Sequence, residues 1–212
     1  MALYVDTAMF EEAKEALALG VVSGITTNPT LIRRTGHDEH EVFTTLASLE
    51  PRQLFIQLSG STLEELTKHM EDIRTAFSTA SVVFKITPTW PAMALCSKWH
   101  DQVDFLVTAV NTVEQAYVAE ASGAKYIAVY LHRFRLRNGS WPPIEDIKAL
   151  VRTRLRIMVA SCHDLAEVRW ALVSGFDDIT LPLSTIQALL VNKDSEEDIA
   201  RFDKDNLRMP RD

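Results

Sequence analysis

Apolar and polar positions along the chain follow two patterns in turn, one typical of strands and one typical of helices. Short runs rich in β-branched and aromatic residues predict strands at about residues 3–5, 21–25, 54–58, 82–86, 103–107, 126–130, 156–160 and 178–181. Between these runs, apolar residues recur at helical spacing, as they do from Leu63 to Phe77. The pattern therefore predicts a strand followed by a helix, repeated eight times.

Local signals place several helix starts and one loop. Residues 61–64 (Ser-Thr-Leu-Glu) and 112–115 (Thr-Val-Glu-Gln) match capping boxes, in which two side chains satisfy the first backbone N–H groups of a helix. Helices are also expected at about 93–99 and about 145–153. Residues 132–137 carry several arginines and are followed by Asn-Gly, which predicts a basic loop.

The alternation of strands and helices indicates parallel strands, and eight such units favour a closed (β/α)₈ (TIM) barrel of the α/β class. A doubly wound open sheet is the alternative, but the chain has no G-x-G-x-x-G or G-K-[ST] phosphate loop to favour it. No Pro/Gly/Ser-rich linker interrupts the sequence, so residues 1–212 are expected to form one domain. The tail, about residues 184–212, is charged beyond Asn192 and predicts an extra C-terminal helix.

Composition narrows the classes of partner. The chain is 47% hydrophobic and 24% charged, with a formal net charge of −7, which argues against nucleic-acid binding. No apolar run approaches the roughly 18 residues of a membrane span, and the start lacks the basic region of a signal peptide. Cys96 and Cys162 make neither a disulfide framework nor a zinc spacing, and the histidines show no metal-ligand spacing. We therefore expect a cytoplasmic protein with no metal and no membrane contact.

One predicted strand carries a residue that does not suit a buried strand. In residues 82–86, alternation places Val83 and Lys85 together on the face opposite Phe84. Burial lowers the pKa of an amine, and a neutral lysine can attack a carbonyl carbon to form a Schiff base. The alternative is an ammonium group that reaches solvent from an edge strand. The strand alone favours neither interpretation.

Polar residues gather where the other predicted strands end. Active sites of (β/α)₈ barrels lie at the carboxyl ends of the strands. Those ends carry Asp6, Thr26-Thr27-Asn28, Gln57, Lys85, Thr108, Tyr130 with Arg133, and Ser161. Alternation turns single polar groups inward from several strands at one end. An amine, an acid/base group and hydrogen-bond donors in one place predict a site that handles carbonyl compounds.

Segments spread over nearly the whole chain also resemble those of one known family, the small transaldolases and fructose-6-phosphate aldolases. The most specific segment is Thr26-Thr27-Asn28-Pro29. The others are Leu3-Tyr4-Val5-Asp6-Thr7, Gly24-Ile25, Gln57, Val83-Phe84-Lys85-Ile86, Thr108-Ala109-Val110, Gly123-Ala124-Lys125-Tyr126, Tyr130, Arg133, Ala160-Ser161 and Ile179-Thr180-Leu181-Pro182-Leu183.

The resemblance implies a class I aldolase mechanism without a metal or another cofactor. Lys85 would attack the donor ketone and form a Schiff base. Asp6 would transfer protons and hold donor hydroxyls. Gln57, Thr108 and Tyr130 would hold the water that carries protons to and from the lysine adduct.

The resemblance also implies the substrate-binding residues. Asn28 would bind the donor near its carbonyl and hydroxyls, while Thr27 would shape the loop. Arg133 and Ser161 would bind the phosphate of the acceptor, which suits a guanidinium fork and a hydroxyl. The implied partners are a sugar or sugar phosphate and further copies of the chain. The implied assembly is a pentamer or decamer in which the C-terminal helix packs on a neighbouring subunit.

Two positions bear on the reaction. Transaldolases of the family usually carry Glu at the position of Gln57 and Phe at the position of Tyr130, so this pair favours an aldolase of the fructose-6-phosphate type. A transaldolase that moves a dihydroxyacetone unit is the alternative, and a non-catalytic sugar-phosphate-binding barrel is a third.

The chain departs from the family around the expected mouth of the site. The departures are Thr87-Pro88-Thr89-Trp90-Pro91, Asn111-Thr112-Val113, Cys162-His163, and Arg135 with Arg137. They leave the acceptor's anionic group open between phosphate and sulfonate. His163 is open between anion binding and starting a helix, and Trp90 between lining the pocket and packing against a neighbour. Cys162 is expected to pack, and Arg135 to lie in a solvated loop.

Overall fold

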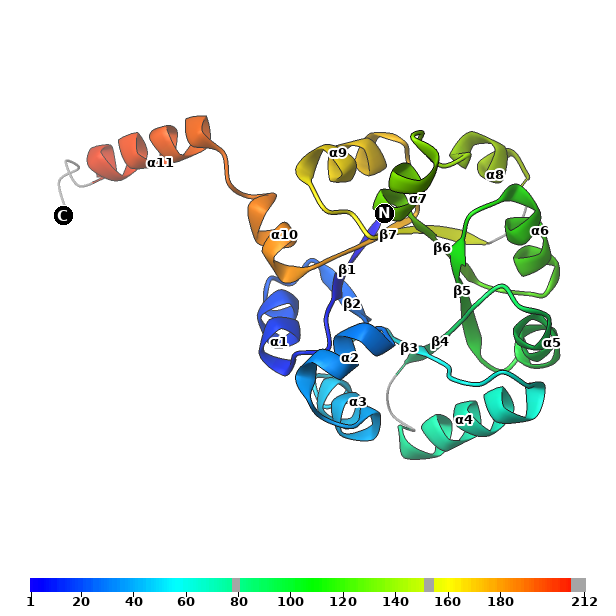
Figure 1. Ribbon diagram of the computed structural model, residues 1–212. Helices are drawn as coiled ribbons and strands as arrows, with labels where there is room; N and C mark the ends of the chain where they lie inside the picture. Colours follow the sequence, from blue (N-terminus) through cyan, green and yellow to red (C-terminus); the bar gives the residue numbers. More distant parts are fainter. Residues whose placement is uncertain (78–80, 151–154, 207–212) are drawn as a thin grey trace.

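The predicted strands close into a barrel in the computed structural model, which describes residues 1–77, 81–150 and 155–206 (Figure 1). Each strand is parallel to its neighbours in chain order, and the last pairs with the first. The strands are β1 (Ala2–Asp6), β2 (Val22–Thr26), β3 (Leu54–Gln57), β4 (Val82–Ile86), β5 (Asp104–Val110), β6 (Tyr126–Tyr130), β7 (Arg156–Ala160) and β8 (Asp178–Leu181). The predicted (β/α)₈ barrel is confirmed, and the open doubly wound sheet is wrong.

Helices surround the ring of strands, except for the last one, which lies apart from it (Figure 1). They are α1 (Phe10–Ala18), α2 (Pro29–Thr35), α3 (Glu39–Ala47), α4 (Leu63–Ala76), α5 (Trp90–Trp99), α6 (Val113–Ala121), α7 (Leu131–Asn138), α8 (Ile144–Leu150), α9 (Leu165–Val173), α10 (Leu183–Ala188) and α11 (Lys193–Asn206). Because the strands carry apolar residues on their outward faces, burying that surface under the helices stabilises the fold by roughly 25 cal/mol per Å².

The inward faces of the strands form a separate cluster inside the barrel. It consists of Tyr4, Phe55, Val83, Leu106, Tyr126, Ala128 and Met158. The ring of Phe55 makes edge-to-face contacts with the rings of Tyr4 and Tyr126, at centroid distances of 5.1 and 5.4 Å. Val83 belongs to this cluster, so the alternation that placed Lys85 on the inward face is confirmed.

Polar side chains close the amino-terminal end of this interior. The Tyr4 hydroxyl donates to Gln53 Oε1 at 2.6 Å, and Gln53 Nε2 donates to the Tyr126 hydroxyl at 2.6 Å. Beside them, Asp178 is fully buried and accepts two hydrogen bonds from Arg156. These partners satisfy buried polar groups that would otherwise destabilise the fold.

Replacing Arg156 by methionine should lower the free energy of unfolding by about 3 kcal/mol, because it leaves the Asp178 carboxylate buried without its cation. This is the low end of the range for broken buried pairs, since the Arg156 side chain is 39% exposed. Urea unfolding at pH 7 measures the change. Lys68→Met removes an exposed ion pair with Asp72 and should cost less than about 1 kcal/mol. Equal losses in the two variants would contradict this account.

Two capping boxes differ from the prediction in detail. The first is shifted by one residue: Thr62, not Ser61, caps α4, and Glu65 rather than Glu64 accepts the N–H of Thr62 at 3.2 Å. Ser61 and Thr62 can both cap a helix, and Glu64 and Glu65 are both glutamates, so the sequence fits a capping box that starts at either residue. At α6, Thr112 caps the helix, but the Gln115 side chain accepts from the Asn111 N–H instead of the Thr112 N–H.

The predicted basic loop at residues 132–137 is wrong, because these residues belong to helix α7. Arginine and leucine favour helices, but the high density of charge obscured any apolar periodicity. The helix follows β6 directly and so places Arg133 in its first turn.

Helix α5 begins at Trp90, before the expected residue 93, and Pro91 is compatible with its first turn. Helix α8 is described from Ile144 to Leu150, and the expected residues 151–153 lie outside the described residues.

The expected extra C-terminal helix is α11, which extends away from the barrel (Figure 1). None of its residues is buried, and Ile199 and Phe202 are 56% and 57% exposed. The remainder of the predicted tail, residues 207–212, lies outside the described part of the chain.

Candidate active site

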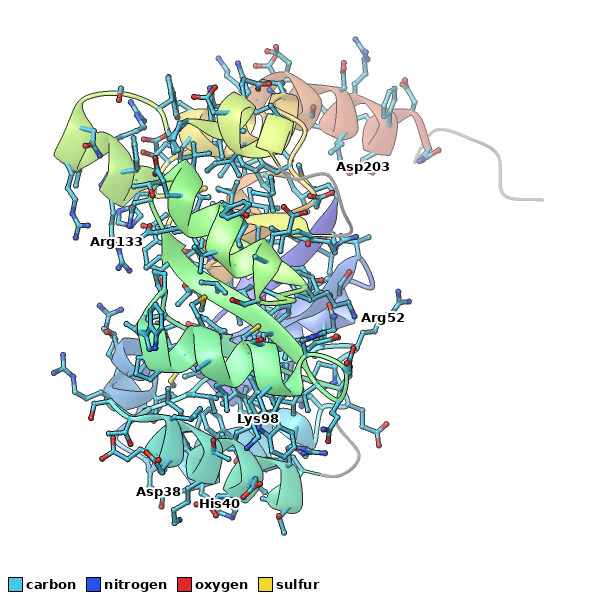
Figure 2. All side chains as sticks on the ribbon, turned by 90° about the vertical axis from the view of Figure 1, so that its right-hand side faces the viewer. Asp38, His40, Arg52, Lys98, Arg133 and Asp203 are labelled. Atoms are coloured by element: carbon cyan, nitrogen blue, oxygen red, sulfur yellow. The ribbon has the colours of Figure 1, made fainter. Side chains whose placement is uncertain are left out.

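A cavity of about 380 Å³ opens at the carboxyl ends of the strands. The predicted site residues that line it are Asp6, Asn28, Lys85, Thr108, Tyr130, Arg133 and Ser161. Figure 2 shows Arg133 at the end of the barrel opposite Arg52, which precedes β3. One end of the barrel therefore brings together side chains from strands that are far apart in sequence, as the alternation pattern predicted.

Lys85 lies inside the barrel with only 6% of its surface exposed. Strand β4 pairs with β3 on one side and β5 on the other, so the edge-strand alternative is wrong. The amine donates to the backbone carbonyl of Thr27 at 2.6 Å. Burial lowers the pKa of Lys85, the negative charge of Asp6 opposes this shift, and the positive charge of Arg133 adds to it. The site therefore favours the neutral, nucleophilic amine.

Asp6 is oriented by two threonines from neighbouring strands. Thr26 Oγ1 donates to Asp6 Oδ1 at 2.7 Å and lies 2.6 Å from Thr180 Oγ1. Thr180 lines the cavity and was not among the predicted site residues. Its signal in the sequence was its place at the end of the last strand. The two threonines hold the Asp6 carboxylate in one orientation, which suits a group that transfers protons.

Tyr130 and Thr108 form the opposite wall. Their hydroxyl oxygens are 2.6 Å apart, and either can donate to the other or to a water. The guanidinium of Arg133 lies over the Tyr130 ring, 4.2 Å from its centroid. This stacking places a cation at the outer edge of the cavity and two hydroxyls deeper inside.

Asn28 lines the cavity and also caps α2. Its Oδ1 accepts from the N–H groups of Thr30 and Leu31, both at 3.1 Å, so its amide nitrogen is left as the donor for a ligand. Thr27 and Gln57 do not line the cavity. Thr27 is fully buried and contributes its carbonyl to Lys85, whereas half-buried Gln57 lies beside Lys85 in strand register.

Cationic and polar groups cluster at the outer end of the cavity. Arg133 and Ser161 are joined there by Arg34, which the sequence did not assign, and by His163, whose role the sequence left open. His163 precedes the N-cap of α9, so it lines the site rather than starting the helix. Ser161 has a φ of 59°, a backbone conformation that is rare without glycine and that is found most often at functional sites.

The remaining residues at the mouth have other roles. Cys162 is buried, and burial raises the pKa of its thiol to about 12, so it stays protonated at neutral pH. Trp90 is 90% exposed and does not line this cavity, so its predicted role as a wall of the pocket is wrong. Arg135 was expected in a solvated loop, but it donates to the buried carboxylate of Glu167.

Across residues 1–77, 81–150 and 155–206, no group of three His, Cys, Asp or Glu side chains is arranged to hold a metal ion. In that same part of the chain, no helix is both long enough and apolar enough to cross a membrane.

Known proteins resemble the chain over nearly its full length. The family described as transaldolase/fructose-6-phosphate aldolase matches residues 3–210. A "probable transaldolase" from Carboxydothermus hydrogenoformans is 27% identical over 217 residues, covering 100% of both chains. One from Streptococcus agalactiae is 28% identical and covers 97% of each.

Solved structures share the fold at low identity. An orotidine 5′-monophosphate decarboxylase from Metallosphaera sedula has a TM-score of 0.60 and 14% identity, covering 88% of this chain and 91% of that one. A thiamine phosphate pyrophosphorylase from Pyrococcus furiosus has a TM-score of 0.58 and 19% identity, covering 85% of each. These likenesses bear on the barrel and not on the reaction.

Proposed function

The chain belongs to the transaldolase/fructose-6-phosphate aldolase family, and on that premise we propose that it is a class I aldolase of the fructose-6-phosphate type. It would reversibly cleave a ketose phosphate into a dihydroxyacetone-type donor and an aldehyde phosphate. The observation that carries the proposal is the buried amine of Lys85, in a cavity that also holds the carboxylate of Asp6. A buried amine beside a carboxylate supplies both the nucleophile and the acid/base group.

The proposed reaction begins when neutral Lys85 attacks the ketone carbon. Loss of water from this adduct gives a protonated Schiff base between the ketone carbon and the lysine nitrogen. Asp6 then takes the proton of the hydroxyl two carbons away, the carbon–carbon bond breaks, and the aldehyde leaves. The electron pair of the broken carbon–carbon bond stays with the donor fragment, which becomes an enamine on the lysine because the iminium nitrogen accepts that pair.

Release of the donor requires a proton on the enamine carbon. We assign its delivery to a water held by the Thr108 and Tyr130 hydroxyls, which lie 2.6 Å apart, and Asp6 returns to that water the proton that it took during cleavage. Protonation regenerates the Schiff base, and a second water hydrolyses it to free ketone and free Lys85. The amide nitrogen of Asn28 would orient the donor's hydroxyls during these steps.

The acceptor's anionic group is assigned to Arg133 and Ser161. Both line the outer end of the cavity, and in the described part of the chain no carboxylate pairs with Arg133. A guanidinium without an ion pair is available to a phosphate.

Replacing Arg133 by methionine should raise the KM for fructose 6-phosphate about 10- to 100-fold, because a charged hydrogen bond to the phosphate is lost. The KM for condensing dihydroxyacetone with unphosphorylated glyceraldehyde should change far less. Steady-state kinetics with fructose 6-phosphate and with glyceraldehyde measure the two changes in KM. The control is Arg137→Met, which removes an exposed arginine from the same helix. Equal rises in KM with both substrates would contradict the role of Arg133.

A transaldolase is the second candidate, because the relatives are named probable transaldolases. In addition, Gln57, one of the two residues that favour an aldolase, does not line the cavity, whereas Tyr130 does. Incubating fructose 6-phosphate alone separates the two. An aldolase releases free dihydroxyacetone, whereas a transaldolase releases none until an acceptor such as erythrose 4-phosphate is added. Binding without either reaction would identify a non-catalytic barrel.

We propose further that residues 1–212 form one domain of a cytoplasmic homo-oligomer, a pentamer or decamer, in which the C-terminal tail packs on a neighbouring subunit. The exposed apolar side chains of Ile199 and Phe202 on α11 support this packing. A monomer in light scattering at working concentration would contradict it.

A further inference from the structure

A buried carboxylate lies behind the outer end of the cavity. Glu167, on α9, has 1% of its surface exposed and does not line the cavity itself. Glutamate is almost never fully buried unless it is paired, so its partners indicate what it holds in place.

Its two oxygens contact two different walls of the site. Oε1 accepts from the guanidinium of Arg135 at 3.0 Å and from Nδ1 of His132 at 2.9 Å, both on α7. A carboxylate can only accept, so this contact assigns the proton to His132 Nδ1. Oε2 accepts from the backbone N–H of His163 at 2.8 Å, in the segment that follows β7. One carboxylate therefore joins the wall that carries Arg133 to the wall that carries Ser161.

The segment that Glu167 holds contains the strained backbone of Ser161. Among the described residues, the hydroxyl of Ser161 has no side-chain hydrogen bond that fixes its φ of 59°. The Ser161 carbonyl accepts from the N–H of His132 at 2.9 Å. The rings of His132 and His163 are stacked, with centroids 3.9 Å apart and planes 13° apart. Such strain persists only where neighbouring groups over-determine it. Here those neighbours are His132 and the His163 N–H, and Glu167 contacts both.

We infer that Glu167 is a positioning residue that fixes Ser161 and Arg133 in the geometry that binds the substrate's anionic group. This inference rests on the proposed function and deepens it. The carboxylate need not touch the ligand: it sets the separation of the two walls and holds the Ser161 turn before the ligand arrives. A site organised in advance binds more tightly, because less ordering remains to be done on binding.

The test is the affinity for inorganic phosphate, measured by isothermal titration calorimetry on the full chain. Glu167→Gln keeps the size of the side chain but removes the charge that binds Arg135, His132 and the His163 N–H. Its phosphate Kd should rise about 10-fold relative to wild type. Glu71→Gln, a matched change at an exposed position on α4, should leave the Kd unchanged. An unchanged Kd in folded Glu167→Gln would overturn the inference, and so would a wild-type protein that binds no phosphate.

A second variant decides the matter should Glu167→Gln not fold. His132→Leu keeps the backbone bond to Ser161 but removes the side-chain hydrogen bond to Glu167 Oε1. It should weaken phosphate binding by about threefold. An unchanged phosphate Kd in this variant would also overturn the inference.

Borohydride trapping of dihydroxyacetone on Lys85, in the same preparations, separates this inference from the proposed function. Dihydroxyacetone carries no anion, so trapping in Glu167→Gln should fall far less than the phosphate affinity. Absence of trapping in the wild type would refute the aldolase. The phosphate titration would still test whether Glu167 positions the anion-binding residues.

Discussion

Replacing Lys85 by methionine is expected to abolish carbon–carbon bond cleavage and, at the same time, to stabilise the folded protein. Methionine fills a similar apolar volume but has no amine, so the Schiff base cannot form. Turnover of fructose 6-phosphate should fall on the order of 10⁴-fold or more, as when other enzymes lose their nucleophile. Coupled assays of aldehyde phosphate release measure the loss, and activity within 100-fold of wild type would refute the assignment.

The gain in stability follows from the direction of the pKa shift. Burial lowers the pKa of Lys85 in the folded protein, so below its unfolded pKa of about 10.4 the unfolded chain binds a proton more readily than the folded one. This difference lowers the free energy of unfolding. The loss is complete at pH values below the folded pKa, and it vanishes at pH values above the unfolded pKa. The variant escapes the cost but leaves the Thr27 carbonyl without its donor.

We therefore expect Lys85→Met to be more stable than wild type by about 1 kcal/mol near pH 7. The difference should shrink as the pH rises towards about 10. Urea unfolding of both proteins at pH 7 and pH 9.5 measures it. A difference that grows with pH would show that the buried amine is not the cause.

Replacing Tyr130 by phenylalanine is expected to convert free cleavage into transfer. The phenylalanine ring can remain beneath the Arg133 guanidinium, so the change is confined to the hydroxyl that lies 2.6 Å from Thr108. Without that hydroxyl, the water that protonates the enamine loses one of its two partners. Release of dihydroxyacetone from fructose 6-phosphate alone should fall about 10²-fold, a usual effect of losing an acid/base contact.

Transfer to erythrose 4-phosphate should survive in this variant, because the enamine attacks the acceptor aldehyde instead of taking a proton. Parallel assays with and without the acceptor measure the ratio of the two rates. Tyr117→Phe removes a hydroxyl from a tyrosine that is 57% exposed on α6, and it should change neither rate. Equal losses of cleavage and transfer in Tyr130→Phe would assign Tyr130 a structural role only.

The sequence predicted the barrel and much of its site for one physical reason. Side chains of a strand alternate between two faces, so a lysine within the apolar run of β4 must point into the barrel or out to the helices. The same alternation placed Asp6 and Tyr130 inward, and the barrel then brought their strand ends together. These positions depend on local periodicity and on a fold with known geometry.

Other parts of the site depend on contacts that no local pattern specifies. Glu167 lies on a predicted helix and resembles any surface glutamate until the fold places Arg135 and His132 against it. Arg34 and His163 line the cavity because of where α2 and the end of β7 are placed. The orientation of Asn28 was likewise hidden, since its role as the N-cap of α2 decides which end of its amide is left for a ligand.

The central claim is that Lys85 is the nucleophile, and borohydride trapping tests it most directly. Wild-type protein is incubated with dihydroxyacetone, hydroxyacetone or fructose 6-phosphate, reduced, and analysed by intact mass and peptide mapping. We predict one stable adduct per chain, located on the peptide that contains Lys85 and absent from Lys85→Met. No adduct with any of the three ketones, or an adduct that persists in Lys85→Met, would contradict the account.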